Sequence, residues 1–252
     1  GEIKLSDIEK VIDAAGAIAI PIDREVFHIL PKEYIIDGQE GIKEPLGMSG
    51  VRLECSAHIV TGSISSAQNI VKCTQKCGIS VSDIVLEQLA SSYAVLGEDE
   101  KDLGVVLVDI GGGTTDVAVI SLGGIVVCTS VKCAGNRIDT AIVDHVKKTY
   151  NLAIGEKTAE EIKIKIGSAV TVEEELSVIV KGRDYITGLP RSVELRTNEI
   201  VKAIAKELRD MIKAIKDVLQ ETPPELASDI IDNGIIMTGG TSQLRNLAEL
   251  VY

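Results

Sequence analysis

Apolar and polar residues in the first part of the chain follow the patterns of one helix and a small sheet. The segment Ser6-Asp7-Ile8-Glu9 is a capping-box pattern, and apolar residues at helical spacing follow it. A largely apolar segment, Glu25–Ile36, predicts a strand bent at Pro31. From Val51 to Ile59 apolar and polar residues alternate, which predicts a half-buried strand with one polar face. We therefore expect residues 1–64 to form a small α+β module.

The rest of the chain alternates helical periodicity with short apolar runs, which is the pattern of an α/β fold. We expect Thr197 or Asn198 to cap a long helix that carries an apolar stripe as far as Leu219. The charged residues 98–102 predict a turn. The other predicted elements are helices over 66–77 (capped by Ser66) and 88–96, one near Ile138 and one opened by Thr158, and strands at 83–87, 105–108, 117–120, 125–128, 176–180, 193–195 and 235–238.

The segment between two of these strands, Asp109–Asp116, concentrates residues suited to binding an anion. Its sequence Asp-Ile-Gly-Gly-Gly-Thr-Thr-Asp predicts a hairpin turn. Successive glycines allow positive φ and a close approach between ligand and backbone, and consecutive backbone N–H groups suit a phosphate. Thr114 and Thr115 add hydroxyl donors, and Asp109, at the strand end, is placed to hold a hydrated Mg²⁺. The alternative is an ordinary glycine-rich hairpin.

Composition narrows the possible functions. The chain has 252 residues, of which 45% are hydrophobic and 25% charged, as expected for a soluble domain with a sizeable core. A formal net charge of −12 argues against direct nucleic-acid binding. No apolar run approaches the roughly 20 residues of a membrane span, and no secretory signal opens the chain. The cysteines lack metal-site spacing, which favours reduced thiols and a cytoplasmic protein.

The hairpin sequence resembles the second phosphate loop of the actin-like ATPase superfamily, which includes actin, the heat-shock chaperone ATPases and the bacterial filament proteins FtsA and MreB. Residues 1–104 resemble FtsA, most specifically through Leu46–Leu53, and residues 120–252 are more similar to MreB, for example in Thr187–Arg191. The resemblance implies a truncated α/β fold of the actin-like (ribonuclease H-like) ATPase type, with a small α+β interaction subdomain at the N-terminus. A natural mosaic, an unusual lineage and an engineered fusion all remain open.

The same resemblance implies a domain division. Residues 1–64 correspond to the FtsA interaction subdomain 1C, 65–103 to a remnant of actin-like domain 1, and 104–252 to domain 2 with an inserted subdomain near 158–197. In FtsA, subdomain 1C mediates self-association and contacts with later division proteins. The alternative for this segment is a small α+β module with no partner.

The resemblance also implies ATP and Mg²⁺ as cofactors. Glu87, which ends one predicted strand and opens a helix, would position the attacking water, although a solvated carboxylate at a helix N-terminus explains it equally well. Glu160 and Lys163, three residues apart, would contact the nucleoside, and a surface ion pair is the alternative. Asp139 resembles the acidic residue of the connecting helix. The expected site residues are Glu87 and Thr115 (catalytic), Gly111, Gly112, Gly113, Thr114, Glu160, Lys163, Gly167, Gly239, Gly240 and Thr241 (cofactor-binding) and Asp109 (metal).

The leading hypothesis is a bacterial actin-like cytoskeletal protein of cell division or cell shape that binds ATP and self-assembles into filaments. It implies partners in the division or shape machinery, an FtsZ-like partner among them, and an indirect position at the inner face of the membrane, since we find no targeting helix. No first phosphate loop precedes the hairpin, so we expect weak nucleotide binding and little hydrolysis. The alternative is a non-catalytic division scaffold, a fragment or chimera, acting through residues 1–64. A sugar or acetate kinase is disfavoured because no separate substrate-binding acid is found.

Overall fold

The structure is a computed structural model that describes residues 1–121 and 123–251, with the side chains of all of these except residue 102. The chain divides into two compact units. Unit 1 comprises Gly1–Val105 with Ile120–Val126, and unit 2 comprises Val106–Val119 with the chain from Val127 onward. The fold is of the α/β class, as the sequence predicts. Each unit is described by itself, and the predicted domain boundaries stay predictions.

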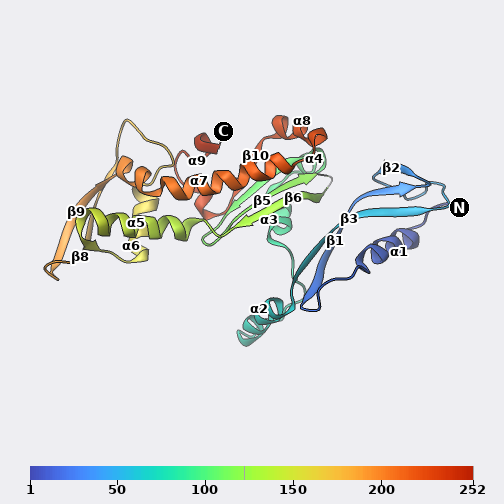
Figure 1. The fold of residues 1–252 in the computed structure, drawn as a ribbon, viewed down its shortest axis with the longest axis horizontal. Helices are drawn as coiled ribbons and strands as arrows, with labels where there is room; N and C mark the ends of the chain where they lie inside the picture. Colours follow the sequence, from blue (N-terminus) through green and yellow to red (C-terminus); the bar gives the residue numbers. More distant parts are fainter. Residues whose placement is uncertain (122, 252) are drawn as a thin grey trace. The chain divides into compact units, whose positions relative to one another are not determined.

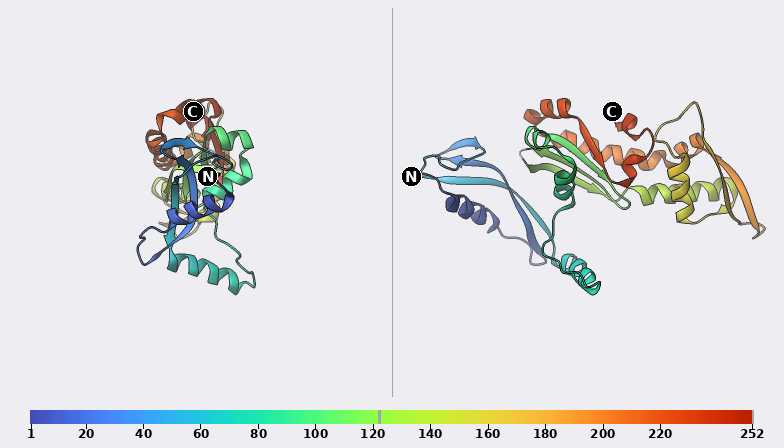
Figure 2. Two further views of the ribbon diagram at one scale, coloured as in Figure 1. Left: turned by 90° about the vertical axis from the view of Figure 1, so that its right-hand side faces the viewer. Right: turned by 180° about the vertical axis from the view of Figure 1, so that it is seen from behind.

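Unit 1 begins with a three-stranded antiparallel sheet and one covering helix (Figure 1). The strand order is β2-β1-β3, and α1 packs on β1 and β3, as the view from behind in Figure 2 also shows. Its small core consists of Ile3, Tyr34, Ile36 and Ile42. The elements are α1 (Leu5–Gly16), β1 (Arg24–Ile36), β2 (Gln39–Ile42) and β3 (Leu53–Ser63).

The predicted start of the helix on this sheet needs correction. The helix starts at Leu5 rather than after Ser6, because the Asp7 carboxylate accepts a hydrogen bond from the amide of Lys4 (3.2 Å) and so fixes the first turn earlier. Strand β1 continues through Pro31, and a shift of register between Pro31 and Glu33 accommodates the proline.

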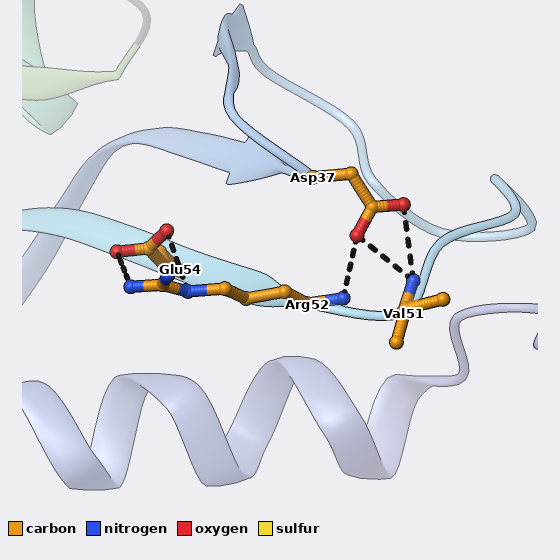
Figure 3. A network of polar contacts seen from close by, with 4 residues as sticks. All are labelled: Asp37, Val51, Arg52 and Glu54. Atoms are coloured by element: carbon orange, nitrogen blue, oxygen red, sulfur yellow. Dashed lines mark hydrogen bonds and ion pairs between the residues drawn. The ribbon is translucent and has the colours of Figure 1, made fainter.

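One polar network fixes the entry of β3 (Figure 3). Asp37, at φ +49°, accepts hydrogen bonds from the amides of Val51 (3.1 Å) and Arg52 (2.7 Å). The Arg52 guanidinium contacts both carboxylate oxygens of Glu54. The two amide donors hold the pKa of Asp37 below its ordinary value, because they favour the charged carboxylate.

Three helices follow in unit 1: α2 (Ile64–Lys76), α3 (Glu87–Val95) and α4 (Glu98–Leu103). Ser63, not Ser66, caps α2, since its hydroxyl accepts the Ser66 amide. The predicted strand at 83–87 is wrong. There the Asp83 carboxylate accepts a hydrogen bond from the amide of Ile84, and this bond competes with strand pairing.

The predicted turn at 98–102 is also wrong, because these residues form most of α4. The amide of Gly97, at the N-cap, donates to the Glu100 carboxylate (2.7 Å). The acidic residues of the first turn also interact favourably with the helix dipole.

A four-stranded sheet, with strand order β10-β4-β5-β6, forms the centre of the second half of the chain. Strands β4 and β5 are almost entirely buried, which explains their apolar runs at 105–108 and 117–120. Strand β10 runs parallel to β4. The bounds are Val105–Ile110 for β4, Thr115–Ser121 for β5, Gly124–Val131 for β6 and Ile235–Thr238 for β10.

Helices α5 and α7 pack side by side in unit 2, and α6 packs on α5 (Figure 1). The predicted apolar stripe of α7 is buried at Ile200, Ile204, Leu208 and Ile215, whereas Ile212 is half-buried and Leu219 is exposed. The elements are α5 (Gly135–Tyr150), β7 (Leu152–Ala153), α6 (Glu156–Ile166), β8 (Ser177–Asp184), β9 (Pro190–Arg196), α7 (Thr197–Glu221), α8 (Pro224–Asn233), the 3₁₀ helix η1 (Gly240–Gln243) and α9 (Leu247–Val251). Two predicted caps are wrong: Gly155 occupies the N-cap of α6, three residues before Thr158, and Arg196 occupies the N-cap of α7, where Thr197 or Asn198 was expected.

Candidate functional site

The glycine-rich segment forms the predicted hairpin between β4 and β5, closed by a hydrogen bond from the Gly111 amide to the Thr114 carbonyl (3.0 Å). Gly112 and Gly113 are exposed, and the described residues provide no acceptor for their amides. None of the three glycines has positive φ, so the hairpin does not use the conformational freedom that they allow. Their contribution is space: a Cβ on Gly112 would lie 3.2 Å from Oδ1 of Asn136. The hairpin therefore presents bare amides, as an anion site requires.

The two threonines of the hairpin differ in their surroundings. Thr115 is fully buried in β5, and its Oγ1 donates to the carbonyl of Cys133 (2.6 Å). Thr114 is half-buried, in the loop itself. The hydroxyl of Thr115 therefore supports the segment before α5, and its predicted catalytic role stays a prediction.

Asp109 lies one residue before the end of β4, opposite Thr238 of β10. A Cβ on Gly239 would come within 2.6 Å of its Oδ1, so the carboxylate lies against the turn that follows β10. Within the described residues no group of three or more His, Cys, Asp or Glu side chains is arranged to hold a metal. One carboxylate at a phosphate site still fits Mg²⁺, which keeps several waters and takes few protein ligands.

The turn after β10 is tied directly to the hairpin. Gly239 has φ +86°, where other residues are strained, and it contacts the backbone of Ile110. Thr241 is buried, and its Oγ1 donates to the carbonyl of Gly111 (2.8 Å). The predicted cofactor residues Gly239, Gly240 and Thr241 therefore lie beside the predicted phosphate loop, although they are distant in sequence.

Helix α6 brings a cation to the same place. Lys163 Nζ pairs with both oxygens of Asp139 in α5 (2.9 and 3.0 Å) and lies 3.4 Å from the Gly135 carbonyl. Burial raises the pKa of Asp139, and the bond from Lys163 opposes this effect. Glu160 is exposed one turn earlier, and Gly167 caps the helix. The alternative of a surface pair between Glu160 and Lys163 is not what the structure shows, since Lys163 pairs with Asp139.

A cavity of about 220 Å³ lies between α6 and the turn. Lys163 and Ile164 of α6 line one side. The other side consists of residues of η1 together with Leu244 and Arg245, which follow it. The full lining is Lys163, Ile164, Gly240, Thr241, Gln243, Leu244 and Arg245. Lys163 and the glycine turn therefore line one cavity, and Thr241 connects this cavity to the predicted phosphate hairpin through its bond to Gly111.

Sequence reasoning missed two residues of this site. A Cβ on Gly135 would lie 2.5 Å from Oγ1 of Thr241 and 3.2 Å from Nζ of Lys163, so this position has no room for a side chain. Arg245 donates from Nε to the Gly167 carbonyl (3.0 Å) and lines the cavity. A glycine before helix α5 was visible in the sequence, but its partners come from distant segments. Glu87 lies in unit 1, exposed at the start of α3, and its predicted role stays a prediction.

The profile of the MreB/Mbl protein family matches residues 60–252. The chain belongs to this family. The profile of the SHS2 domain that is inserted in FtsA matches residues 1–61. The actin-like resemblance predicted from the hairpin is thereby confirmed.

Curated relatives extend this result. The cell division protein FtsA of Pseudomonas aeruginosa is 42% identical over 251 residues, which is 99% of this chain and 57% of that protein. The cell shape-determining protein Mbl of Bacillus subtilis is 45% identical over 148 residues, 59% of this chain and 44% of that protein. Similarity to FtsA thus continues through the segment whose motifs resemble MreB. The chain spans somewhat more than half the length of these FtsA relatives.

Solved structures confirm the actin-like fold. Crystal structures of MreB5 of Spiroplasma citri, bound to ADP and to AMPPNP, match with TM-scores of 0.69 and 0.68 at 35% and 36% identity, each covering 75% of this chain and 57% of the other. A MamK double helical filament shares the fold at 23% identity, with a TM-score of 0.58 over 75% of this chain and 56% of the other. Across the part of the chain that the structure describes, no helix has the length and apolarity of a membrane span.

Proposed function

We propose that unit 2 binds ATP with Mg²⁺, with the phosphates at the Gly111–Gly113 hairpin and the nucleoside in the cavity beside Lys163. One observation carries the proposal: the bond from Thr241 to the Gly111 carbonyl joins the hairpin to the glycine turn around that cavity. The nucleotide-bound MreB5 structures support it, since ADP and AMPPNP are bound by proteins of the same fold.

Each part of the ligand has a chemical counterpart. The bare amides of the hairpin would bind phosphate oxygens, Asp109 would hold a hydrated Mg²⁺, and Lys163, which lines the cavity, would contact the nucleoside. The Mg²⁺ supplies charge neutralisation at the phosphates. This local neutralisation is needed because the chain carries a formal net charge of −12.

Calorimetric titration with Mg-ATP tests this proposal with two valine variants. Gly112→Val places a bulky side chain at the exposed hairpin and should weaken binding at least ~10-fold, because the phosphate loses its backbone donors. Gly155→Val is the matched control: Gly155 is exposed, has φ −86°, and a Cβ there would meet nothing within 4 Å, so binding should not change. Equal affinities for both variants, or no heat with the unmodified chain, would overturn the proposal.

We further propose that the protein acts as a bacterial actin-like cytoskeletal protein in cell division, assembling through nucleotide-linked head-to-tail contacts at the cytoplasmic side of the membrane, alongside division proteins that include an FtsZ-like partner. Its FtsA relatives and the MamK filament of the same fold support this role. Sedimentation and electron microscopy with Mg-ATP should show filaments, and a monomer at all concentrations would contradict assembly.

A second candidate function is a non-catalytic scaffold that acts through residues 1–64. The match of the FtsA-inserted SHS2 domain to residues 1–61 favours it. Calorimetry of the whole chain separates the two functions: binding of a division protein without any heat from Mg-ATP would support the scaffold alone.

A further inference from the structure

Arg245 is the side chain at the cavity whose role the nucleotide site does not by itself explain. Its guanidinium faces the carbonyl end of α6: Nε donates to Gly167 (3.0 Å) and Nη2 to Ile166 (3.1 Å). A cation there satisfies carbonyls that a helix end leaves without partners and interacts favourably with the helix dipole.

The same guanidinium also reaches the start of α7. Nη2 lies 3.4 Å from Oγ1 of Thr197, a fully buried hydroxyl that also bonds the backbone of Leu176. The carbonyl of Arg245 accepts the amide of Ala169 (2.8 Å). Arg245 therefore joins three segments: the end of α6, the start of α7 and the turn after β10.

We propose that Arg245 is a positioning residue that sets the width of the nucleoside cavity. The cavity has Lys163 and Ile164 of α6 on one side and the turn from Gly240 to Leu244 on the other. The turn is fixed to the hairpin by Thr241, and α6 is fixed to the turn by Arg245. Loss of the guanidinium would leave the hairpin intact and let the two cavity walls separate.

Packing at Gly167 makes this spacing strict. A Cβ at Gly167 would lie 2.3 Å from the Lys163 carbonyl and 3.0 Å from Cδ1 of Leu244. The end of α6 is thus in close contact with the turn, and a small displacement changes the space available to a base. This inference rests on the proposed nucleotide site and concerns selectivity for the base.

The test compares Mg-ATP with Mg-GTP by calorimetry. Arg245→Met should weaken ATP binding about 10-fold, as expected for loss of charge-assisted hydrogen bonds, and should narrow the preference for ATP over GTP. Arg245→Lys keeps the positive charge and one donor nitrogen, so it should recover part of the ATP affinity and part of the preference for ATP. Arg209→Met, at an exposed arginine of α7 that does not line this cavity, is the matched control and should leave both affinities unchanged.

Two outcomes would overturn the role of Arg245. One is an Arg245→Met protein that binds ATP as tightly as the unmodified chain. The other is an equal loss for ATP and GTP with a lowered melting temperature, which would indicate a purely structural contact.

Hydrogen exchange separates this inference from the proposed function. In Arg245→Met, amides in the last turn of α6 should exchange at least ~5-fold faster without any nucleotide present, because the guanidinium that holds the carbonyls of Ile166 and Gly167 is lost and this end of the helix opens more often. If the unmodified chain binds no nucleotide, the proposed function fails. Unchanged exchange in Arg245→Met would then also show that the Arg245 guanidinium does not hold the end of α6 in place. Unchanged exchange with intact ATP binding rejects the role of Arg245 alone.

Discussion

Gly135 lies where α5, the turn after β10 and Lys163 meet, and a Cβ there would lie 2.5 Å from Oγ1 of Thr241. Gly135→Ala should therefore displace Thr241 from the hairpin and lower the free energy of unfolding by about 1–3 kcal/mol, the usual cost of overpacking. Urea denaturation measures this value. Gly113→Ala is the control, since its Cβ meets nothing within 4 Å and its φ is not positive. Equal stabilities of the two variants would show that Thr241 moves aside without cost.

Lys163 stabilises a carboxylate that burial disfavours. Burial raises the pKa of Asp139 even with Lys163 beside it, and Lys163→Met should raise this pKa further. Above the ordinary carboxyl pKa of about 4, the unfolded chain releases this proton before the folded chain does, so stability falls as pH rises towards the folded pKa. The stability lost on substitution should therefore be larger at pH 7 than at pH 4, by about 1–3 kcal/mol.

Denaturation of Lys163→Met and of the unmodified chain at both pH values gives this difference, and other carboxylates cancel in the comparison. The double variant Lys163→Met/Asp139→Asn should lose most of the pH dependence. A constant difference between pH 4 and pH 7 would mean that Asp139 is not the group involved.

The individual site residues were predictable to different degrees. Gly112, Thr241 and Lys163 belong to motifs that local sequence reveals, and the structure brings them together. Gly135 and Arg245 could not be assigned because their roles depend on atoms that the fold brings close from distant segments. The hairpin glycines permit positive φ, and the structure does not use these angles, because permission is not a requirement.

At the level of elements, long periodic segments were predicted correctly and short charged ones were not. The buried stripe of α7 and the apolar strands β4 and β5 follow directly from periodicity. Helix α4 depends instead on one carboxylate, Glu100, which accepts a hydrogen bond from the Gly97 amide. The absence of a strand from the described residues 83–87 depends likewise on Asp83, which accepts the Ile84 amide. Such side-chain bonds compete with the backbone hydrogen bonds of helices and strands, so the hydrophobic pattern alone does not decide these segments.

The entry of β3 offers a test of one such carboxylate. Hydrogen bonds to Asp37 hold its pKa below the ordinary value, so its contribution is present above the unfolded pKa and is lost as pH falls through the folded pKa. Asp37→Asn should keep the Val51 and Arg52 amides protected at neutral pH, because its oxygen still accepts and Asn tolerates φ +49°. Asp37→Ala should lose this protection.

Amide exchange followed by NMR reads both positions directly. In the unmodified chain protection of Val51 and Arg52 should decrease in acid, whereas in Asp37→Asn it should show no such decrease. Asp13→Ala, at an exposed position of α1, is the control and should behave as the unmodified chain. Full protection in Asp37→Ala would show that the strand pairing alone fixes these amides.

For the molecule as a whole, motif agreement was enough to predict the superfamily, and the family match over residues 60–252 confirms it. How far the similarity to each family extends along the chain was harder to predict. Both families share the hairpin, and a motif reports only on its own short segment. An alignment with FtsA across 99% of the chain shows that similarity to FtsA is not confined to the first part.

Net charge sets a condition on the proposed self-assembly. Copies that each carry a formal charge of −12 repel one another, and this repulsion extends over about 30 Å at 10 mM salt but only about 8 Å at 150 mM. We therefore expect the pelleted fraction with Mg-ATP to rise as NaCl increases from ~10 to ~150 mM. A chain without nucleotide is the control and should stay in solution throughout. If the pelleted fraction falls with added salt, complementary ion pairs dominate the contact and repulsion between the acidic copies does not limit assembly.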